Sequence, residues 1–327
     1  MKNKLLYLVI PILCGFVFSH CSTDIPNGFP SDPYPDAGTD IVVVPTSQPD
    51  TVIPNGDWQI INPNEFRMGK TVSDQNCPDD ALPVHPVELS GRFAIMRYEV
   101  TADQFRQFVN ANKDEVSMPQ EPFWKWVDWK GRSRGSHPVV WVSWKEAKAF
   151  AEWVGGRLPT EAEWEHCARA GQASSIRFSG STTLDNVAFY YKEDLSIVDT
   201  ITVFMQGENE VVRIGRMPRK VGSWKKTGVQ PANAWGIYDM SGNVMEWCND
   251  WYGEDYYQLC REGKAPNAGI ARDSVAVDPK GPSEGMFKII RGGGWNSTAD
   301  FCTVYIRLRL HPGTRSDEIG FRVVKDL

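Results

Sequence analysis

The stretch SWKEAKAFAEWVGGRLPTEAEWE, residues 143–165, contains two helix starts separated by a glycine turn. Ser143 with Glu146, and Thr160 with Glu163, each have the spacing of a capping box, in which two side chains bond to free backbone N–H groups at a helix N-terminus. Apolar residues recur on one helical face after the first box, and a Gly-Gly pair then ends the segment. The stretch therefore predicts two short, capped helices whose apolar faces pack into a core.

A third capping box pairs Thr101 with Gln104, and Val100 and Phe105 flank it at the spacing of a hydrophobic staple. The helix that begins at Thr160 is expected to end at Gly171. Short strand-like segments alternate with turns elsewhere, at Val87–Leu89, Phe93–Met96, Phe287–Ile290 and Phe321–Val324. Short helices mixed with short strands indicate an α+β fold with little regular secondary structure.

Composition limits the class of protein. Of the 327 residues, 41% are hydrophobic, so most of the chain can bury a core. The net charge of −6 argues against a nucleic acid as partner, because binding one requires a clustered basic surface. The 13 Trp and 28 Gly residues suggest a loop-rich domain held together by large aromatic side chains. No repeat and no change of composition divides residues 55–327, so we expect one domain there.

The N-terminus has the pattern of a targeting segment. Lys2 and Lys4 precede an apolar run over residues 5–18, which is the length of a signal peptide and shorter than a membrane span. The sequence FSHC that ends at Cys21 resembles a lipobox, although His20 stands where Gly or Ala is usual. We expect a signal peptide over residues 1–20 and a lipid on Cys21; ordinary secretion with cleavage nearby is the alternative.

Residues 21–54 are predicted to be a tether. Residues 22–54 contain seven prolines and five aspartates and have no lysine or arginine, a composition that stays extended and solvated. A lipid, a tether and a globular domain together predict an exported protein of the bacterial cell envelope. The membrane would be the outer membrane, with the protein on its periplasmic or surface face, held only through the lipid anchor.

Five blocks in order resemble one family, the formylglycine-generating enzymes, also called sulfatase-modifying factors. The blocks are Glu65–Gly69, Pro83–Val109, His137–Glu165, Trp235–Trp251, and Arg291–Trp295 continued at Ile319–Arg322. This resemblance implies a C-type-lectin-like α+β fold with bound calcium. It also implies descent from oxidoreductases that convert a cysteine, within a Cys-x-Pro-x-Arg segment of a sulfatase, to formylglycine with oxygen and copper(I).

The resemblance assigns copper to two thiolates spaced Cys-x4-Cys after an Arg-Gly-Gly element. The matching positions here are Ser297 and Cys302. Copper(I) is soft and prefers thiolates, whereas a serine hydroxyl is a hard donor that stays protonated. We therefore expect that copper is not bound, and Cys302 remains as the single candidate catalytic residue.

Calcium ligands are implied by the same resemblance. Asp239, Gly242, Val244 and Glu246 match the family's set of side-chain and carbonyl oxygens, which suits hard Ca²⁺. The alternative is that Glu246 only caps or pairs locally. Asn186 and Val187 match the first half of a second family site, but its downstream half has no convincing counterpart here.

Six cysteines remain after removal of the signal peptide, and five after lipidation of Cys21. At most two disulfides can form from five thiols. A pairing between Cys248 and Cys302 is conceivable, but spacing alone leaves the connectivity open.

The segment from Asn296 to Asp317 corresponds to the copper and substrate region of the family. One interpretation is that its polar residues are solvated loop positions; the other is a ligand surface, as in lectin-fold proteins diversified by retroelements. The residues predicted for that surface are Trp295, Asn296, Asp300, Tyr305, Arg307, Arg309 and Arg315.

Three functions are compatible with these patterns. The first is a binding or assembly module without copper oxidase activity, with a protein or glycan ligand at the cell envelope. The second is a diverged oxidoreductase that relies on Cys302 and another ligand. The third is a structural part, as in the gliding-motility and secretion-associated lipoproteins that carry this domain. Whether the protein is an enzyme stays open at this point, because only one of the two copper positions is a cysteine.

Overall fold

The computed structural model describes residues 41, 45–47, 49–70, 79–121, 134–172, 176–188, 190, 200–205, 208–213 and 230–327. The predicted signal peptide, the lipidation site Cys21, the tether up to residue 40 and Cys77 lie outside these residues. Within the described part of the chain, no helix is long and apolar enough to cross a membrane.

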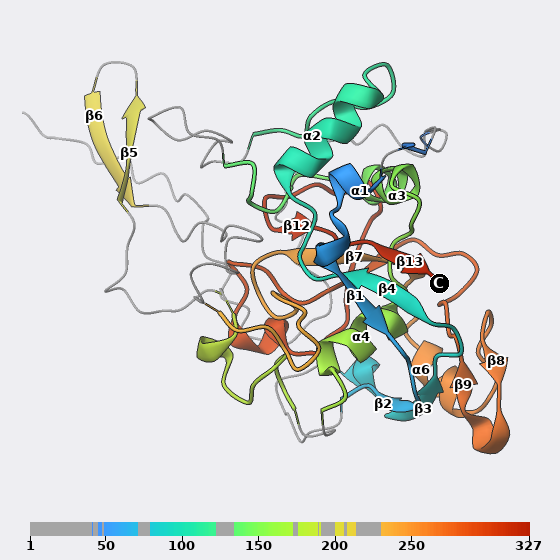
Figure 1. The fold of residues 1–327 in the computed structure, drawn as a ribbon. Helices are drawn as coiled ribbons and strands as arrows, with labels where there is room; N and C mark the ends of the chain where they lie inside the picture. The colour runs from blue at the N-terminus through green and yellow to red at the C-terminus, as the bar shows by residue number, and fades with distance from the viewer. Residues whose placement is uncertain are drawn as a thin grey trace, which may run out of the picture.

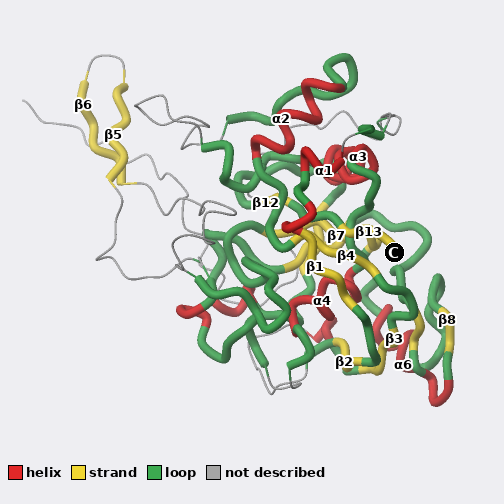
Figure 2. The backbone as a smooth tube through the Cα atoms, viewed as in Figure 1, coloured by secondary structure: helices red, strands yellow, loops and turns green. Residues whose placement is uncertain are grey.

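Short helices and short strands alternate along the described chain (Figures 1 and 2). The helices are α1 (Pro49–Val52), α2 (Ala102–Ala111), α3 (Trp144–Trp153), α4 (Glu161–Arg169) and α6 (Tyr256–Arg261). The strands are β1 (Trp58–Ile61), β2 (Phe66–Met68), β3 (His85–Glu88), β4 (Phe93–Met96), β5 (Thr200–Met205), β6 (Glu208–Arg213), β7 (Met245–Trp251), β8 (Gly269–Ile270), β9 (Ala276–Val277), β10 (Lys288–Arg291), β11 (Leu308–Leu310), β12 (Ile319–Gly320) and β13 (Val324–Asp326).

The strands form small mixed sheets. Their orders are β1-β4-β13, β11-β10-β7-β12 and β2-β3-β9-β8, with β5 and β6 as a separate antiparallel pair. Most neighbours are antiparallel, whereas β12 with β7 and β3 with β9 are parallel. This arrangement confirms the α+β class and the low content of regular structure.

All three predicted capping boxes are present. In each of them the N-cap side chain, of Thr101, Ser143 or Thr160, accepts a hydrogen bond from the backbone N–H three residues on, and the acidic or amide side chain there bonds back. Helix α4 ends earlier than predicted, at Arg169, because Ala170 adopts the left-handed conformation with φ 49° ahead of Gly171.

Two segments of the structure differ from the boundaries expected from the sequence. The globular domain begins before residue 55, because Val52 and Ile53 are buried in the core and the Thr46 N–H donates to the Trp153 carbonyl at 2.6 Å. Most of the predicted strand Phe321–Val324 lies between two strands, since β12 ends at Gly320 and β13 begins at Val324. The chain passes from one sheet to another here, with Phe321 fully buried in the crossing.

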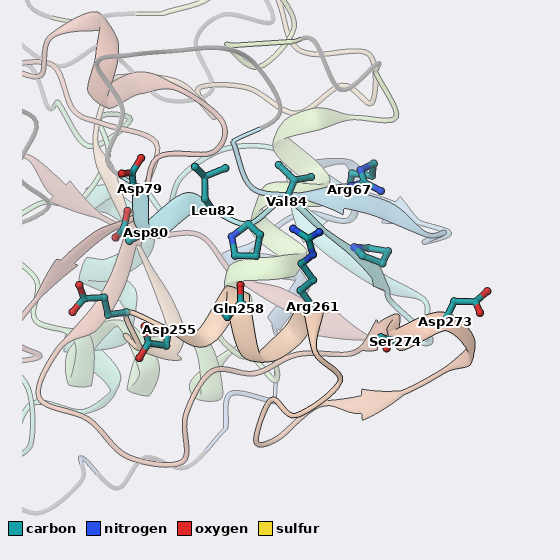
Figure 3. Close-up of a pocket in the computed structure, with 13 residues that line it drawn as sticks. Arg67, Asp79, Asp80, Leu82, Val84, Asp255, Gln258, Arg261, Asp273 and Ser274 are labelled. Carbon is teal, nitrogen blue, oxygen red and sulfur yellow. The ribbon is translucent and has the colours of Figure 1, made fainter.

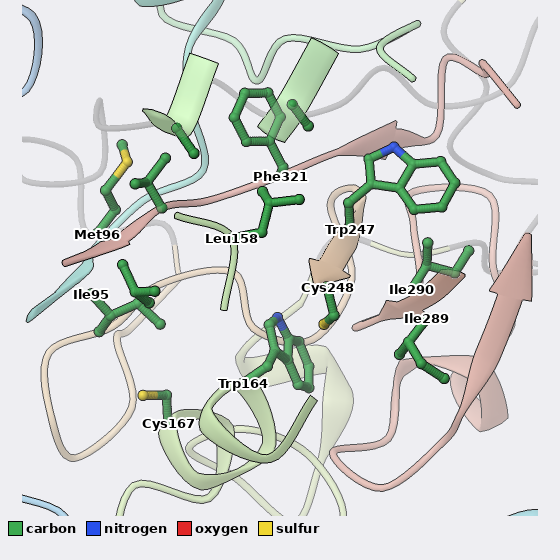
Figure 4. Packing of buried hydrophobic residues seen from close by; sticks show 14 of the residues in the cluster. Ile95, Met96, Leu158, Trp164, Cys167, Trp247, Cys248, Ile289, Ile290 and Phe321 are labelled. Carbon is green, nitrogen blue, oxygen red and sulfur yellow. The ribbon is translucent and has the colours of Figure 1, made fainter. Parts of the chain in front are cut away.

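Large aromatic side chains fill the core. Trp164 of α4 and Trp247 of β7 are fully buried and lie among Ile289, Ile290 and Phe321 (Figure 4). Their indole N–H groups are satisfied, since Trp247 donates to the Val142 carbonyl at 3.0 Å. Full burial of such side chains contributes most of the apolar stabilisation of the domain.

A network of five charged side chains lies inside this core, and none of them is more than 4% exposed. Arg291 at the end of β10 contacts Glu165 at 2.5 Å and Glu161 at 3.2 Å, which are one helical turn apart on α4. Arg169 pairs with Glu165 at 2.7 Å, and Arg307 with Glu161 at 2.8 Å. The network therefore ties α4 to β10 and to the chain just before β11.

Backbone groups complete the network. Glu165 also accepts from the Gly69 N–H at 2.8 Å, and Arg169 donates to the Gly69 carbonyl at 2.6 Å. Burial alone would raise the pKa of the Glu165 carboxyl, but Arg169 and Arg291 hold it below its usual value. Glu165 is therefore ionised at neutral pH, and removing one member leaves buried charges without a partner.

We predict that Glu165→Ala lowers the free energy of unfolding by about 3–5 kcal/mol, because Arg169 loses its acidic partner and Arg291 one of two. Glu152→Ala is the matched control, since Glu152 pairs with Lys148 at 2.8 Å on the surface. That change is expected to cost about 1 kcal/mol or less. Urea denaturation of both variants measures the difference, and equal losses would contradict the role given to the network.

Candidate functional site

The turn that precedes β7 carries the predicted calcium ligands. Asp239, Gly242 and Asn243 have φ of 58°, 80° and 71°, so the chain coils tightly here. The Gly242 N–H donates to the Gly292 carbonyl at 2.7 Å, and the Trp295 N–H donates to the Asn243 carbonyl at 2.7 Å. The structure thus brings the calcium turn and the Arg-Gly-Gly loop, some fifty residues apart in the sequence, into direct contact.

Glu246 is fully buried and already bound by side chains. Its Oε1 lies 2.6 Å from Arg322 Nη2, and its Oε2 accepts from Arg322 Nε at 2.7 Å and from Trp164 Nε1 at 2.8 Å. The local pairing considered as an alternative for Glu246 is therefore present. Calcium at this turn would depend on the Asp239 side chain and on the carbonyls of Gly242 and Val244. Glu246 would stay paired with Arg322.

Glu99 was not predicted as part of the site but lies beside it. It is fully buried, and its Oε2 accepts from Asn243 Nδ2 at 2.6 Å. Its Oε1 has no hydrogen-bond partner among the residues that the structure describes. Burial raises the pKa of Glu99, and the nearby carboxylates of Asp239 and Glu246 raise it further. The only sequence signal for Glu99 was an acidic residue between two apolar ones in the Tyr98–Thr101 motif.

The net charge around the Asp239 turn bears on whether a calcium ion fits there. Three carboxylates, those of Glu99, Asp239 and Glu246, act on one another here, with the Arg322 guanidinium as the cation that the structure places among them. A divalent cation at the turn would balance that excess of negative charge. Among the described residues, no three Asp, Glu, His or Cys side chains converge as a ready-made metal site, so backbone carbonyls are required.

The two residues predicted for the second calcium site lie in different environments, one at the surface and one in the core. Asn186 is exposed at the end of a 3₁₀ turn, Leu184–Asn186, and Val187 is buried. Val187 packs in an apolar cluster with Phe178, Leu184 and Cys302. The carbonyl predicted as a ligand therefore belongs to a residue whose side chain covers the candidate catalytic cysteine.

Ser297 closes a backbone turn. Its Oγ accepts a hydrogen bond from the Gly294 N–H at 2.9 Å, and its own N–H donates to the Gly294 carbonyl at 3.0 Å. The hydroxyl thus stabilises the loop that follows the Arg-Gly-Gly element. The Ser297 side chain has a shape similar to that of cysteine, but its oxygen lacks the affinity of sulfur for copper(I).

Cys302 is fully buried at the end of the 3₁₀ turn Ala299–Cys302. A Cβ added at Gly293 would lie 2.7 Å from its Sγ, so the glycine packs directly on the thiol. Burial raises the pKa of Cys302 far above its usual value, and Glu318 and Asp300 raise it further. The group is an apolar, protonated thiol rather than a thiolate.

The remaining motif residues are structural as well. Gly292 has φ 94°, and a Cβ there would lie 3.1 Å from the Trp164 indole, so only glycine allows this approach. Cys167, Cys248, Cys260 and Cys302 are all free and buried, so the conceivable disulfide between Cys248 and Cys302 is not formed.

The predicted binding surface is only partly a surface. Trp295, Tyr305 and Arg307 were expected there but are buried, Tyr305 within the apolar core and Arg307 in the ion network with Glu161. Asn296 is exposed, and Asp300, Arg309 and Arg315 are half-buried. Asp300 pairs with Arg177 at 2.5 Å, and Arg315 with Glu146 at 3.0 Å.

The chain matches the family described as Sulfatase-modifying factor enzyme 1-like domain over residues 44–327. It is 31% identical to the formylglycine-generating enzyme of Thermomonospora curvata over 80% of this chain and 90% of that protein. It is 30% identical to the serine/threonine-protein kinase pkn1 of Chlamydia pneumoniae over 82% of this chain, but spans only 38% of that kinase.

Solved structures support the same fold. PvdO from Pseudomonas aeruginosa superposes with a TM-score of 0.62 at 24% identity, over 89% of this chain and 100% of that one. Treponema denticola variable protein 1 superposes with a TM-score of 0.57 at 22% identity, over 83% and 95%. At these identities the likeness concerns the fold alone.

We predict that Cys302 does not react with iodoacetamide in the native protein at about pH 8, because it is buried and its pKa is raised. Peptide mapping by mass spectrometry of native and guanidinium-unfolded samples measures this. Complete alkylation only after unfolding is expected; rapid alkylation of Cys302 in the native state would contradict the burial described here.

Proposed function

Because the chain belongs to the family of sulfatase-modifying factor enzyme 1-like domains, we propose that it keeps the family scaffold but works as a binding or assembly module instead of a copper oxidase. The observation that carries this proposal is the pair of positions where the family holds copper. The Ser297 hydroxyl accepts a hydrogen bond from the backbone, and Cys302 is buried against Gly293 and an apolar cluster. One buried, protonated thiol is a poor copper(I) site, because thiolates are the ligands that the metal requires.

The range of named relatives supports a role other than formylglycine formation. Some of the relatives are named formylglycine-generating enzymes, whereas the chlamydial ones are named kinases. The same domain is thus found in proteins with different names, and its sequence does not by itself specify one activity.

The ligand in this proposal is a protein or glycan at the cell envelope. Its contact surface is the exposed part of the loop that holds Asn296, Asp300, Arg309 and Arg315. These partly exposed side chains offer an amide, a carboxylate and two guanidiniums, and guanidiniums suit acidic or hydroxyl-rich groups.

We predict that the protein, loaded with copper(I), does not convert a Cys-x-Pro-x-Arg peptide to formylglycine, because one of the two thiolates is missing. Mass spectrometry of the peptide measures the product, and the Thermomonospora curvata enzyme is the positive control. The Ser297→Cys variant restores the pair and is expected to bind copper(I) more tightly than the unmodified protein. Formylglycine made by the unmodified protein would instead support the diverged oxidoreductase that relies on Cys302.

A calcium ion at the Asp239 turn is part of the same proposal. Its support is the excess of buried carboxylates beside one guanidinium, together with two backbone carbonyls in a tightly coiled turn. The ion would hold the turn that contacts Gly292 and Trp295, and so its role is structural.

We predict that chelation lowers the melting temperature by several degrees, because an ion bound only to the folded state at about a hundred times its Kd adds about 2.7 kcal/mol. Asp239→Asn should abolish this response, and Asp114→Asn, an exposed position, should retain it. Asp239→Asn is a better test than Glu246→Ala, which would strip Arg322 of its carboxylate. A melting curve of the unmodified protein that ignores chelator would reject the site.

Export and anchoring complete the proposal. The mature protein is held to the bacterial envelope by a lipid on Cys21, and residues between Cys21 and the domain act as a spacer. The support is the charged start, the apolar run and the proline-rich segment of the sequence.

Replacement of the anchor gives a direct test. Cys21→Ala is expected to move the protein from the membrane fraction to the soluble fraction, whereas Cys77→Ala should not. Immunoblots of the two fractions measure the change, and unaltered membrane association of Cys21→Ala would remove the anchor from the proposal.

A further inference from the structure

A groove of about 1050 Å³ lies between the β2–β3 hairpin and helix α6 (Figure 3). One wall is formed by β2, the start of β3 and the 3₁₀ turn Asp79–Ala81; the other is formed by α6 and the segment around Ser274. None of its lining residues belongs to the calcium turn or to the loop with Ser297 and Cys302. The groove is therefore a feature separate from the site described above.

The groove has charged ends and an apolar middle. In Figure 3, Asp79, Asp80 and Asp255 lie on one side of Leu82 and Gln258. Arg67 and Arg261 lie toward the other side, with Asp273 beyond Arg261. Leu82 and Val84, with Pro83 and Pro86, line the stretch between them. Leu82 is 39% exposed, between the buried Ala81 and the half-buried Pro83.

The charged side chains of the groove are not used in ion pairs within the described structure. Arg67, Asp79, Asp255 and Arg261 are exposed, and no salt bridge joins them to each other or to other described residues. Unpaired charges of opposite sign, held at separate ends of one groove, are arranged to meet a ligand rather than to stabilise the fold.

Asp80 is fixed in place from inside the domain. Its Oδ2 accepts from the Tyr252 hydroxyl at 2.9 Å, and its carbonyl accepts from Arg307 Nη1 at 3.0 Å. Its Oδ1 is shielded from solvent and has no hydrogen-bond partner among the described atoms. Asp80 is thus held in place at the acidic end, where Asp79 and Asp255 supply the exposed carboxylates.

We infer that this groove binds an extended segment of a partner protein, with a basic side chain at the Asp79–Asp80–Asp255 end and an acidic side chain at Arg67 and Arg261. The volume is at the upper limit of small-molecule sites, which favours a peptide segment. The apolar middle suits short aliphatic residues or proline between the two charged ones. This inference goes beyond the proposed function, because it assigns a second and independent binding surface.

The net negative charge of the residues that line the groove disfavours anionic ligands. Five carboxylates and two guanidiniums line the groove, so phosphate-rich ligands would be repelled overall. A second copy of this chain, with its net charge of −6, is disfavoured for the same reason.

The experiment uses fluorescein-labelled octapeptides in which one Lys and one Glu are separated by Val, Pro and Ala at varied spacing. Control peptides replace the charged pair with two Lys, two Glu or two Gln. Fluorescence anisotropy with the full mature protein measures Kd at low and high salt. At least one Lys/Glu peptide should bind more tightly than every control peptide, and its affinity should fall with salt.

Variants of the groove then test the assignment. Asp79→Asn and Asp255→Asn should each weaken the Lys/Glu peptide by about two- to fivefold, as expected for an exposed ion pair. Glu115→Gln, at an exposed position that does not line the groove, is the matched control and should leave the affinity unchanged.

A change of preference separates binding from misfolding. Arg67→Glu combined with Arg261→Glu makes both ends acidic, so the variant should prefer the Lys/Lys peptide over the Lys/Glu peptide. The inference is overturned if no Lys/Glu peptide binds better than the controls, or if the double variant keeps the original preference. Neither result depends on whether formylglycine is formed, so failure here is distinguishable from failure of the proposed function.

Discussion

Three buried arginines connect the elements of this domain through ion pairs that lie in its interior. Arg291 joins β10 to two turns of α4, Arg307 joins the chain before β11 to the first turn of α4, and Arg322 joins the end of the chain to β7. Aromatic rings cover the guanidiniums, with Trp164 over Arg291 and Tyr257 over Arg307. Because the strands are short and the sheets small, these pairs fix the relative positions of elements that backbone ladders do not connect.

This dependence gives the family motif a structural role that is independent of copper. In the Arg-Gly-Gly element, Arg291 belongs to the ion network, Gly292 admits the Trp164 indole, and Gly293 packs on Cys302. Each of the three residues has a structural reason that does not involve copper. Similarity in such blocks therefore indicates the same fold, whereas the residue types at positions 297 and 302 bear on copper binding.

Local signals were predicted well from the sequence and distant ones were not. The capping boxes at Thr101, Ser143 and Thr160 involve residues three apart, so spacing alone identifies them. The pairing of Arg291 with Glu165 joins positions 126 residues apart, which spacing cannot reveal. Arg307 was assigned to a surface because charged residues usually lie there; only the placement of Glu161 opposite it explains its burial. The family resemblance supplied the positions of the site residues, whereas Glu99 and the groove beside α6 emerged only from the folded chain.

The four thiols described here are reduced, and each lies within a packed core. A fold that contains no cross-link among these positions derives its stability from ion pairs and aromatic packing, which do not change with the redox state of the surroundings. Cys167, Cys248, Cys260 and Cys302 would therefore make the same contacts in a reducing cytoplasm and in an oxidising compartment. The vulnerable interval is the time before folding is complete, when these sulfurs are accessible and could join incorrectly. Burial of α4, which carries Cys167, therefore also protects that sulfur from oxidation.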